Sequence, residues 1–225
     1  MGTIRPYFDL KGHSGWVRSV AIQGDRIVSG SDDGTVKVWQ VSTGLLEKTL
    51  AGHFTWVCSV AIDGDRIVSS SEDGTVNVWQ ASTGLLEKTL TGHSTWVCSV
   101  AIQGDRIVSG SDDGTVKVWQ VSTGLLKKTL VGHSEWVYSV AIQGDRVVSG
   151  SRDRKVCMWK VWNPSMGMDA FACLIRRRCN QESPLARLPV ELLRLLFSYI
   201  HDECDARALL LPYKEEWRQN VIGRE

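Results

Sequence analysis

Short apolar segments, separated by turn residues, recur along most of this chain at a constant interval. Within residues 12–51, four such segments occupy 16–22, 26–31, 35–41 and 45–50, and each is rich in Val, Ile, Leu, Trp or Thr. The stretches between them carry Gly, Asp, Ser and Thr, which favour tight turns. This pattern predicts four short β-strands joined by hairpin turns.

The four-strand unit is repeated. The dipeptide Gly-His begins copies near residues 12, 52, 92 and 132, and residues 12–51 differ from residues 92–131 at only four positions. Segments such as Val-Ala-Ile at 20–22 are apolar on both sides of the pleat, which is typical of strands covered on both faces. One such sheet cannot bury both faces alone, so the repeat predicts sheets packed radially against one another.

At these residues the chain resembles the WD40 repeat family over roughly residues 7–162, although the terminal Trp-Asp signature reads Trp-Gln or Trp-Lys. The resemblance implies an all-β propeller of four four-stranded antiparallel blades within residues 1–162. It also implies a scaffold that binds proteins or peptides with the rim of the propeller and needs no cofactor or metal. The last copy lacks a fourth strand, so the N-terminal segment near residues 7–11 is expected to complete a C-terminal blade.

Each copy holds a Ser, a His and an Asp at fixed spacing, which is also the composition of a hydrolase triad. The resemblance instead assigns them, with a Trp, to a buried structural network, and active sites seldom occur in four equal copies. Ser29 or Ser31 can serve as the first hydroxyl partner, and we favour Ser29. The predicted structural sets are His13, Ser29, Asp33, Trp39; His53, Ser69, Asp73, Trp79; His93, Ser109, Asp113, Trp119; and His133, Ser149, Asp153, Trp159.

The copies differ mainly at five aligned positions, those of residues 14, 15, 18, 32 and 37. We expect all five to flank the Gly-His loop or the turn after the second strand, on one rim of the propeller. Variation there indicates either a binding face on a fixed scaffold or drift in exposed loops. The neighbouring Trp16, Trp56, Trp96 and Trp136 are expected mainly to fill the core, and the alternative is that they anchor a partner. The predicted rim residues are Ser14, Gly15, Arg18, Phe54, Thr55, Cys58, Thr95, Cys98, Glu135, Tyr138 and Arg152.

Composition narrows the range of partners. The formal net charge of +1 argues against binding to nucleic acid through many phosphate contacts. The sequence offers no apolar run of the ~18 residues that a membrane span needs and no signal-peptide pattern at its start. The six cysteines are expected to be free thiols in a reducing compartment. We therefore expect a cytoplasmic or nuclear protein.

The composition changes after the repeats. Residues 163–183 form a predicted linker, and residues 184–225 form a predicted helical tail with Leu at helical spacing. The tail resembles an F-box, which implies docking to a Skp-type adaptor and a role as substrate receptor of a cullin ubiquitin ligase. The alternative is a helical cap on an open blade edge. The predicted docking residues are Leu188, Pro189, Leu192, Leu193, Leu196 and Phe197.

Ring closure is the last question that the sequence raises. The resemblance implies a ring of seven or eight blades, whereas the four copies in this chain provide only four blades. An open arc would expose two apolar blade faces, which soluble monomers avoid. A homodimer closing an eight-bladed ring is one solution, and coverage of an open face by the tail is the other.

Overall fold

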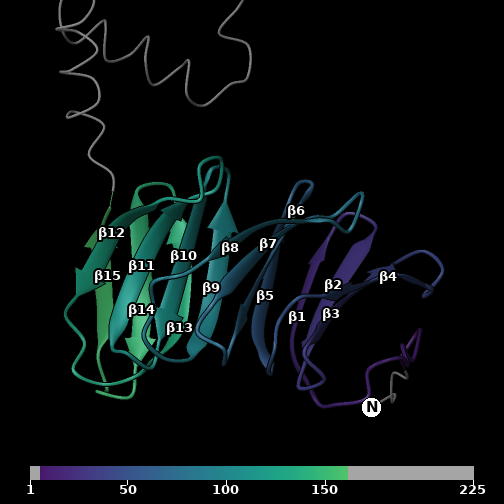
Figure 1. Cartoon of the computed structure of the whole chain (residues 1–225), viewed down its shortest axis with the longest axis horizontal. Coiled ribbons are helices and arrows are strands. Elements are labelled where there is room, and N and C mark those ends of the chain that lie inside the picture. Colours follow the sequence, from purple (N-terminus) through teal and green to yellow (C-terminus); the bar gives the residue numbers. More distant parts are fainter. Residues whose placement is uncertain (1–5, 162–225) are drawn as a thin grey trace, which may run out of the picture. The chain divides into compact units, whose positions relative to one another are not determined.

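Fifteen β-strands and no helix make up residues 6–161, the part of the chain that the computed structural model describes. They form four antiparallel sheets that follow one another in chain order (Figure 1). The first sheet contains β1 (Val17–Gln23), β2 (Arg26–Ser31), β3 (Thr35–Gln40) and β4 (Leu46–Ala51). The second contains β5 (Val57–Asp63), β6 (Arg66–Ser71), β7 (Val76–Gln80) and β8 (Leu86–Leu90). No helix within this range is long and apolar enough to cross a membrane.

The third and fourth sheets repeat the same order. The third contains β9 (Val97–Gln103), β10 (Arg106–Ser111), β11 (Thr115–Gln120) and β12 (Leu126–Val131). The fourth contains β13 (Val137–Gln143), β14 (Arg146–Ser151) and β15 (Val156–Lys160), so within residues 6–161 it has three strands. The predicted all-β architecture of antiparallel sheets is confirmed, and each predicted strand lies within one residue of the observed one. The predicted linker and helical tail lie outside the described residues.

The turns explain why the sequence repeats its glycines. Gly34 ends the tight turn between β2 and β3, where its backbone has a φ of 77° and its N–H donates to the Ser31 carbonyl. This left-handed conformation suits glycine because a Cβ would be strained there. The fourth copy has Arg154 at the equivalent position, with a φ of 67°. The last sheet therefore contains a strained turn that the first three lack.

The core lies between the sheets. Val57 and Val60 on β5 pack against Val28, Val36 and Val38 of the preceding sheet, and all five side chains are buried. The same arrangement recurs where β9 meets the second sheet and where β13 meets the third. Each sheet is therefore stabilised by its neighbours, as the repeat predicts.

Polar contacts join the same sheets. The Val60 N–H donates to the Ser19 hydroxyl at 3.0 Å, and the Gly64 N–H donates to Gln23 Oε1 at 2.7 Å. Both bonds recur with a shift of 40 residues at the next two interfaces. Hydrogen bonds of fixed geometry set how each sheet is placed on the next.

Candidate functional site

In each of the four sheets, a hydrogen-bond network of the same kind connects the turn between the second and third strands to the sheet. In the first copy, Trp39 Nε1 donates to Ser29 Oγ at 2.8 Å, and His13 Nε2 lies 2.8 Å from the same oxygen. The other ring nitrogen, His13 Nδ1, lies 2.8 Å from Asp33 Oδ2. The remaining three sets have the same contacts, with Trp79, Trp119 and Trp159 as the indole donors. In the first network the hydroxyl partner is therefore Ser29, as the sequence favoured, and each later network uses the counterpart of Ser29.

The carboxylates of these networks are strongly stabilised in their ionised form. Burial opposes the ionisation of Asp33, but hydrogen bonds from Thr35, His13 and the Ser14 N–H outweigh it and hold the pKa well below its ordinary value. The pKa values of Asp73 and Asp113 are lowered against burial in the same way. Burial also lowers the pKa of His53 and His93, despite the neighbouring carboxylates. The second and third networks therefore pair an ionised Asp with a neutral His at neutral pH.

These sets are placed to stabilise turns. The hydroxyl-bearing Ser29, Ser69, Ser109 and Ser149 are all buried, and each Oγ is held by an indole N–H. A nucleophile in a hydrolase must reach a substrate carbonyl, and these oxygens have no open approach. Meanwhile Asp33 accepts from the Ser14 N–H and binds Thr35, which fixes the Gly-His loop to the turn after β2.

The loops fixed in this way form one face that carries the variable residues. Arg18 occupies a β-bulge, because Val17 pairs with Ser31 while Ser19 pairs with Gly30. Cys58, Cys98 and Tyr138 occupy the same bulge in the later sheets. A bulge leaves one residue unpaired and changes the direction of its side chain. The extra residue here is one of the five positions that differ between copies.

The structure leaves every predicted rim residue at least partly exposed. Phe54 is almost fully exposed on the Gly-His loop, and Arg152 is exposed on the turn after β14. The fifth variable position does not belong to this rim. Lys37, Asn77 and Lys117 are buried within their sheets and bind Thr49, Thr89 and Thr129 on the adjacent strands. Position 37 lies inside the β3 strand rather than at its loop end, which is why that expectation was wrong.

The expectation that the loop-face tryptophans mainly fill the core is also wrong. Trp56, Trp96 and Trp136 are 40–42% exposed, and Trp16 is 79% exposed. Trp56 and Trp96 meet edge to face with ring centroids 6.2 Å apart. The three rings therefore present aromatic surface along the loop face of consecutive sheets.

Arg18 forms a cation–π contact with one of these tryptophans. Its guanidinium carbon lies 4.7 Å from the centre of the Trp56 ring, on the next sheet. The same guanidinium forms an ion pair with Asp32, including a bond from Nη2 to Oδ2 of 2.9 Å. The side-chain hydrogen bond to Asp32 raises the pKa of Arg18. Asp32 and Trp56 together form a slot for a planar cation, which Arg18 occupies.

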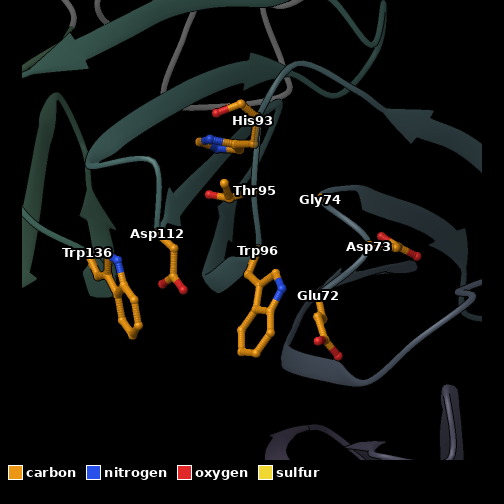
Figure 2. A pocket seen from close by; sticks show the side chains of 9 residues that line it. Glu72, Asp73, Gly74, His93, Thr95, Trp96, Asp112 and Trp136 are labelled. Carbon is orange, nitrogen blue, oxygen red and sulfur yellow. The ribbon is translucent and has the colours of Figure 1, made fainter.

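The equivalent slot between the second and third sheets has no arginine in it. Cys58 replaces the arginine, while Glu72 and Trp96 take the places of Asp32 and Trp56. Figure 2 shows the Glu72 carboxylate on one side of the Trp96 ring and Asp112 and Trp136 on the other. These side chains line an open pocket of about 520 Å³, together with Asp73, Gly74 and the loop 93–95. Within residues 6–161 the Glu72 carboxylate forms no hydrogen bond or salt bridge with a side chain, and its charge is among those that raise the pKa of Arg18.

Sequence reasoning missed this pocket because its two halves come from different copies. Aligned positions place Cys58 and Glu72 in one copy and Trp96 in the next. The alignment does not show that the side chain of Arg18 reaches the following sheet. The available signal was the change from Arg18 to Cys58 beside an invariant Trp. That change removes a cation and leaves its partners in place.

The sequence profile described as "WD domain, G-beta repeat" matches residues 4–40, 44–80, 84–120 and 124–160. The chain belongs to the WD40 family. The WD40 matches begin at the segment before each Gly-His dipeptide and end at the Trp-Gln or Trp-Lys dipeptide. This phase places residues 4–11 in the first repeat, in the position that β4 holds in the second.

Single repeats resemble WD40 proteins of diverse function. The nuclear distribution protein PAC1 of Lachancea thermotolerans is 54% identical over 43 residues, which are 17% of this chain and 9% of that protein. The pre-mRNA-splicing factor PRP46 of Saccharomyces cerevisiae is 49% identical over 45 residues, or 19% of this chain and 10% of that protein. The matched segments span about a tenth of these relatives.

Solved structures match about two thirds or more of this chain. The computationally designed Ika4 protein superposes with a TM-score of 0.67 at 35% identity, covering 72% of this chain and 100% of that chain. The computationally designed Ika8 protein superposes with a TM-score of 0.64 at 36% identity, covering 67% of this chain and 48% of that chain. This chain thus matches all of the Ika4 chain and about half of the Ika8 chain.

The predicted adaptor-docking residues lie outside the described residues. These are Leu188, Pro189, Leu192, Leu193, Leu196 and Phe197.

Proposed function

We propose that this WD40 protein is an interaction scaffold whose loop face binds a protein segment through a cationic side chain. The slot between Glu72 and Trp96 receives that side chain. The observation that carries the proposal is the occupied counterpart of the slot, in which Arg18 lies on Trp56 and pairs with Asp32. The chain thus contains both the recognition chemistry and a copy of the site from which the internal cation has been removed.

The charge of the slot favours a cation. Burial raises the pKa of the Cys58 thiol to about 11, so the thiol stays neutral at neutral pH and the negative charge of the slot comes from carboxylates. Glu72 and Asp112 contribute carboxylates to the lining, and within residues 6–161 no lysine or arginine lines the pocket. Cys58 is also much shorter than arginine, which leaves space beside the Trp96 ring for an incoming side chain.

The rest of the rim supplies the surface around this slot. Phe54 and Thr55 are exposed on the loop before it, and Glu135, Tyr138 and Arg152 are exposed beyond it. A mixed surface with aromatic anchors and a polar surround is typical of protein interfaces. A peptide segment with Arg or Lys near its centre would therefore find both a specific slot and general contact area.

The test uses a small probe in place of the unidentified partner. Titration with N-acetyl-arginine methylamide should shift the indole N–H resonance of Trp96 saturably, with a dissociation constant on the order of 1 mM. N-acetyl-citrulline methylamide, which has the same shape without the charge, should leave that resonance unchanged. Glu72→Gln should abolish the response to the arginine probe.

Trp16→Phe serves as the matched control, because it changes an exposed loop-face indole outside the slot. That variant should keep the Trp96 response. An equal response to both probes, or a full response in the Glu72→Gln variant, would refute the cationic slot. Binding of an acidic probe instead would move the partner into another chemical class.

Adaptor docking is a second candidate function, supported by the sequence of residues 188–200 alone. A purified Skp-type adaptor should co-purify with the full chain, and Leu192→Asp with Phe197→Asp should abolish capture. Leu85→Asp, on an exposed turn of the second sheet, is the control that should leave capture intact. Capture that survives the double substitution would dismiss the F-box interpretation.

A further inference from the structure

Within residues 6–161, the first and last sheets each leave one apolar face uncovered. On the first sheet, Val17, Val20 and Ile22 of β1 are exposed by half or more. On the fourth sheet, Val156 is 80% exposed and Met158 is 72% exposed. The counterparts of these five residues in the internal sheets are buried or partly buried. Figure 1 shows the two sheets at opposite ends of the series.

The two uncovered faces are complementary halves of an interface that the chain already forms three times. At each internal interface, the counterparts of Val17 and Val20 pack against the counterparts of Val156 and Met158. For example, Val57 and Val60 meet Val36 and Val38. The face of β1 therefore has the residues that fit the face of the fourth sheet.

The polar groups of the two ends match as well. Ser139 and Gln143 on β13 are the counterparts of Ser19 and Gln23, which accept hydrogen bonds from the next sheet. Val20 and Gly24 are the counterparts of Val60 and Gly64, whose N–H groups donate those bonds. A first sheet seated on a fourth sheet would restore both bonds.

A third complement is the missing outer strand. Residues 7–11 precede the first sheet as residues 47–51 precede the second, so Leu10 corresponds to Leu50. Phe8 lies against Gly44 in the same way that Lys48 lies against Gly84. The segment thus already sits where the outer strand of a preceding sheet would lie, and within residues 6–161 no strand pairs with the free side of β15.

We propose that two copies of this chain join head to tail twice and close a ring of eight sheets. Each copy's β1 face covers the other's fourth sheet, and each segment 7–11 adds the fourth strand beside the partner's β15. Two identical contacts related by a twofold axis give closed symmetry, which leaves neither apolar face exposed. The match of four sheets to 48% of the Ika8 chain supports an array of twice this length.

Closure also completes the loop face. No sheet within residues 6–161 precedes the one that Trp16 introduces, whereas Trp56 stands beside Arg18, the bulge residue of the preceding sheet. In the ring, Trp16 of one copy would stand beside Tyr138 and Arg152 of the other. The partner copy would thus contribute a residue to the fourth position of the rim.

Light scattering of the full chain tests the proposal. The expected species has twice the single-chain mass of 25.0 kDa. Val20→Asp and Met158→Asp, one on each face, should each reduce the mass to that of a single chain. Gly150→Val should do the same, because Gly150 has open space beside it in one chain, whereas its counterpart Gly110 faces Val137 and Val140.

Leu85→Asp is the control that should preserve the dimer, since Leu85 is exposed on the turn before β8. Circular dichroism of each variant should show the wild-type β spectrum, which separates dissociation from unfolding. A non-aggregating wild-type species of 25.0 kDa would overturn the proposal and point to coverage by residues 162–225. A dimer unaffected by all three substitutions, or an open-ended polymer, would overturn it equally.

Discussion

Val20 and Val60 occupy the same position in consecutive copies, yet Val20 is 67% exposed and Val60 is 5% exposed. The strands that carry them are almost identical in sequence, and both pair with the next strand in the same register. The difference is that, among the sheets of residues 6–161, one packs in front of the second sheet and none packs in front of the first. In a repeat fold, burial is a property of the neighbour as much as of the residue.

The fourth sheet shows the same difference from the other side. Val116 and Val118 on β11 are buried by the next sheet, whereas Val156 and Met158 on β15 are exposed. The internal interfaces therefore show which apolar residues would have to pack against each end sheet to bury it. Measurements of the free energy of unfolding can test this contrast between internal interfaces and exposed end faces.

The largest expected effect is a charge in an internal interface. Val60→Asp places an unpaired carboxylate among buried valines, and we expect a cost of more than about 4 kcal/mol, enough to unfold the chain. Val20→Asp changes the same position on the exposed face and should leave the fold intact. Circular dichroism at neutral pH provides the comparison.

Native-like spectra for both variants would contradict the contrast, because they would mean that the internal interface accommodates a charge. Loss of structure in both would mean that the β1 face is needed for folding of a single chain.

A smaller effect is expected from the Trp–Ser–His–Asp networks. Ser69→Ala removes the acceptor of the buried Trp79 indole and the partner of His53, which should cost about 1–3 kcal/mol. Ser149→Ala makes the same change beside Trp159, which is only partly buried. In a single chain, whose fourth sheet is uncovered within residues 6–161, water can replace the lost bond, so the loss should be smaller at chain concentrations too low for two copies to join. Urea denaturation measures both, and a larger loss for Ser149→Ala would reverse the ranking.

These contrasts also show what the sequence can and cannot predict. The period of 40 residues and the Gly, Asp and Ser turns predict the strands to within one residue, because hairpin turns and alternating packing are local. Contacts between copies are not local. The bond from Val60 to Ser19 and the reach of Arg18 to Trp56 depend on how far one sheet is rotated against the next. The spacing of residues within a single copy does not predict that rotation.

The same limit explains the two errors on the loop face. Lys37 was expected on the rim because it varies between copies, but its strand continues into the sheet and its ammonium binds Thr49. The loop-face tryptophans were expected in the core because they are large and repeated. They stand at strand ends, beyond the packed valines, where no neighbouring sheet covers them fully.

The turn after β14 offers a change in the opposite direction. Arg154 has a φ of 67°, whereas the first three copies have glycine at this position. Arg154→Gly should relieve the left-handed strain and raise the free energy of unfolding by about 1 kcal/mol. Thermal denaturation of the variant beside Lys155→Gly, one residue further on, separates this gain from a general effect of glycine. An equal or lower melting temperature for Arg154→Gly would show that the turn is not strained.

The smallest expected effect on stability comes from Arg18, and it sharpens the comparison between the occupied and the open slot. The ion pair with Asp32 and the contact with Trp56 are near the surface, so Arg18→Cys should change the free energy of unfolding by at most about 1 kcal/mol. The substitution gives the first slot the residue that the second slot has naturally. If the guanidinium of Arg18 occupies a cation site, its removal should create a second binding site for N-acetyl-arginine methylamide. The Trp56 indole resonance, unresponsive in the wild type, should then shift with the probe as Trp96 does. Trp56 must respond while stability is nearly unchanged, because the proposal assigns the arginine to the slot and not to the fold. An unresponsive Trp56 in a folded Arg18→Cys variant would mean that a carboxylate and an indole are insufficient, and that the Glu72 slot needs another explanation.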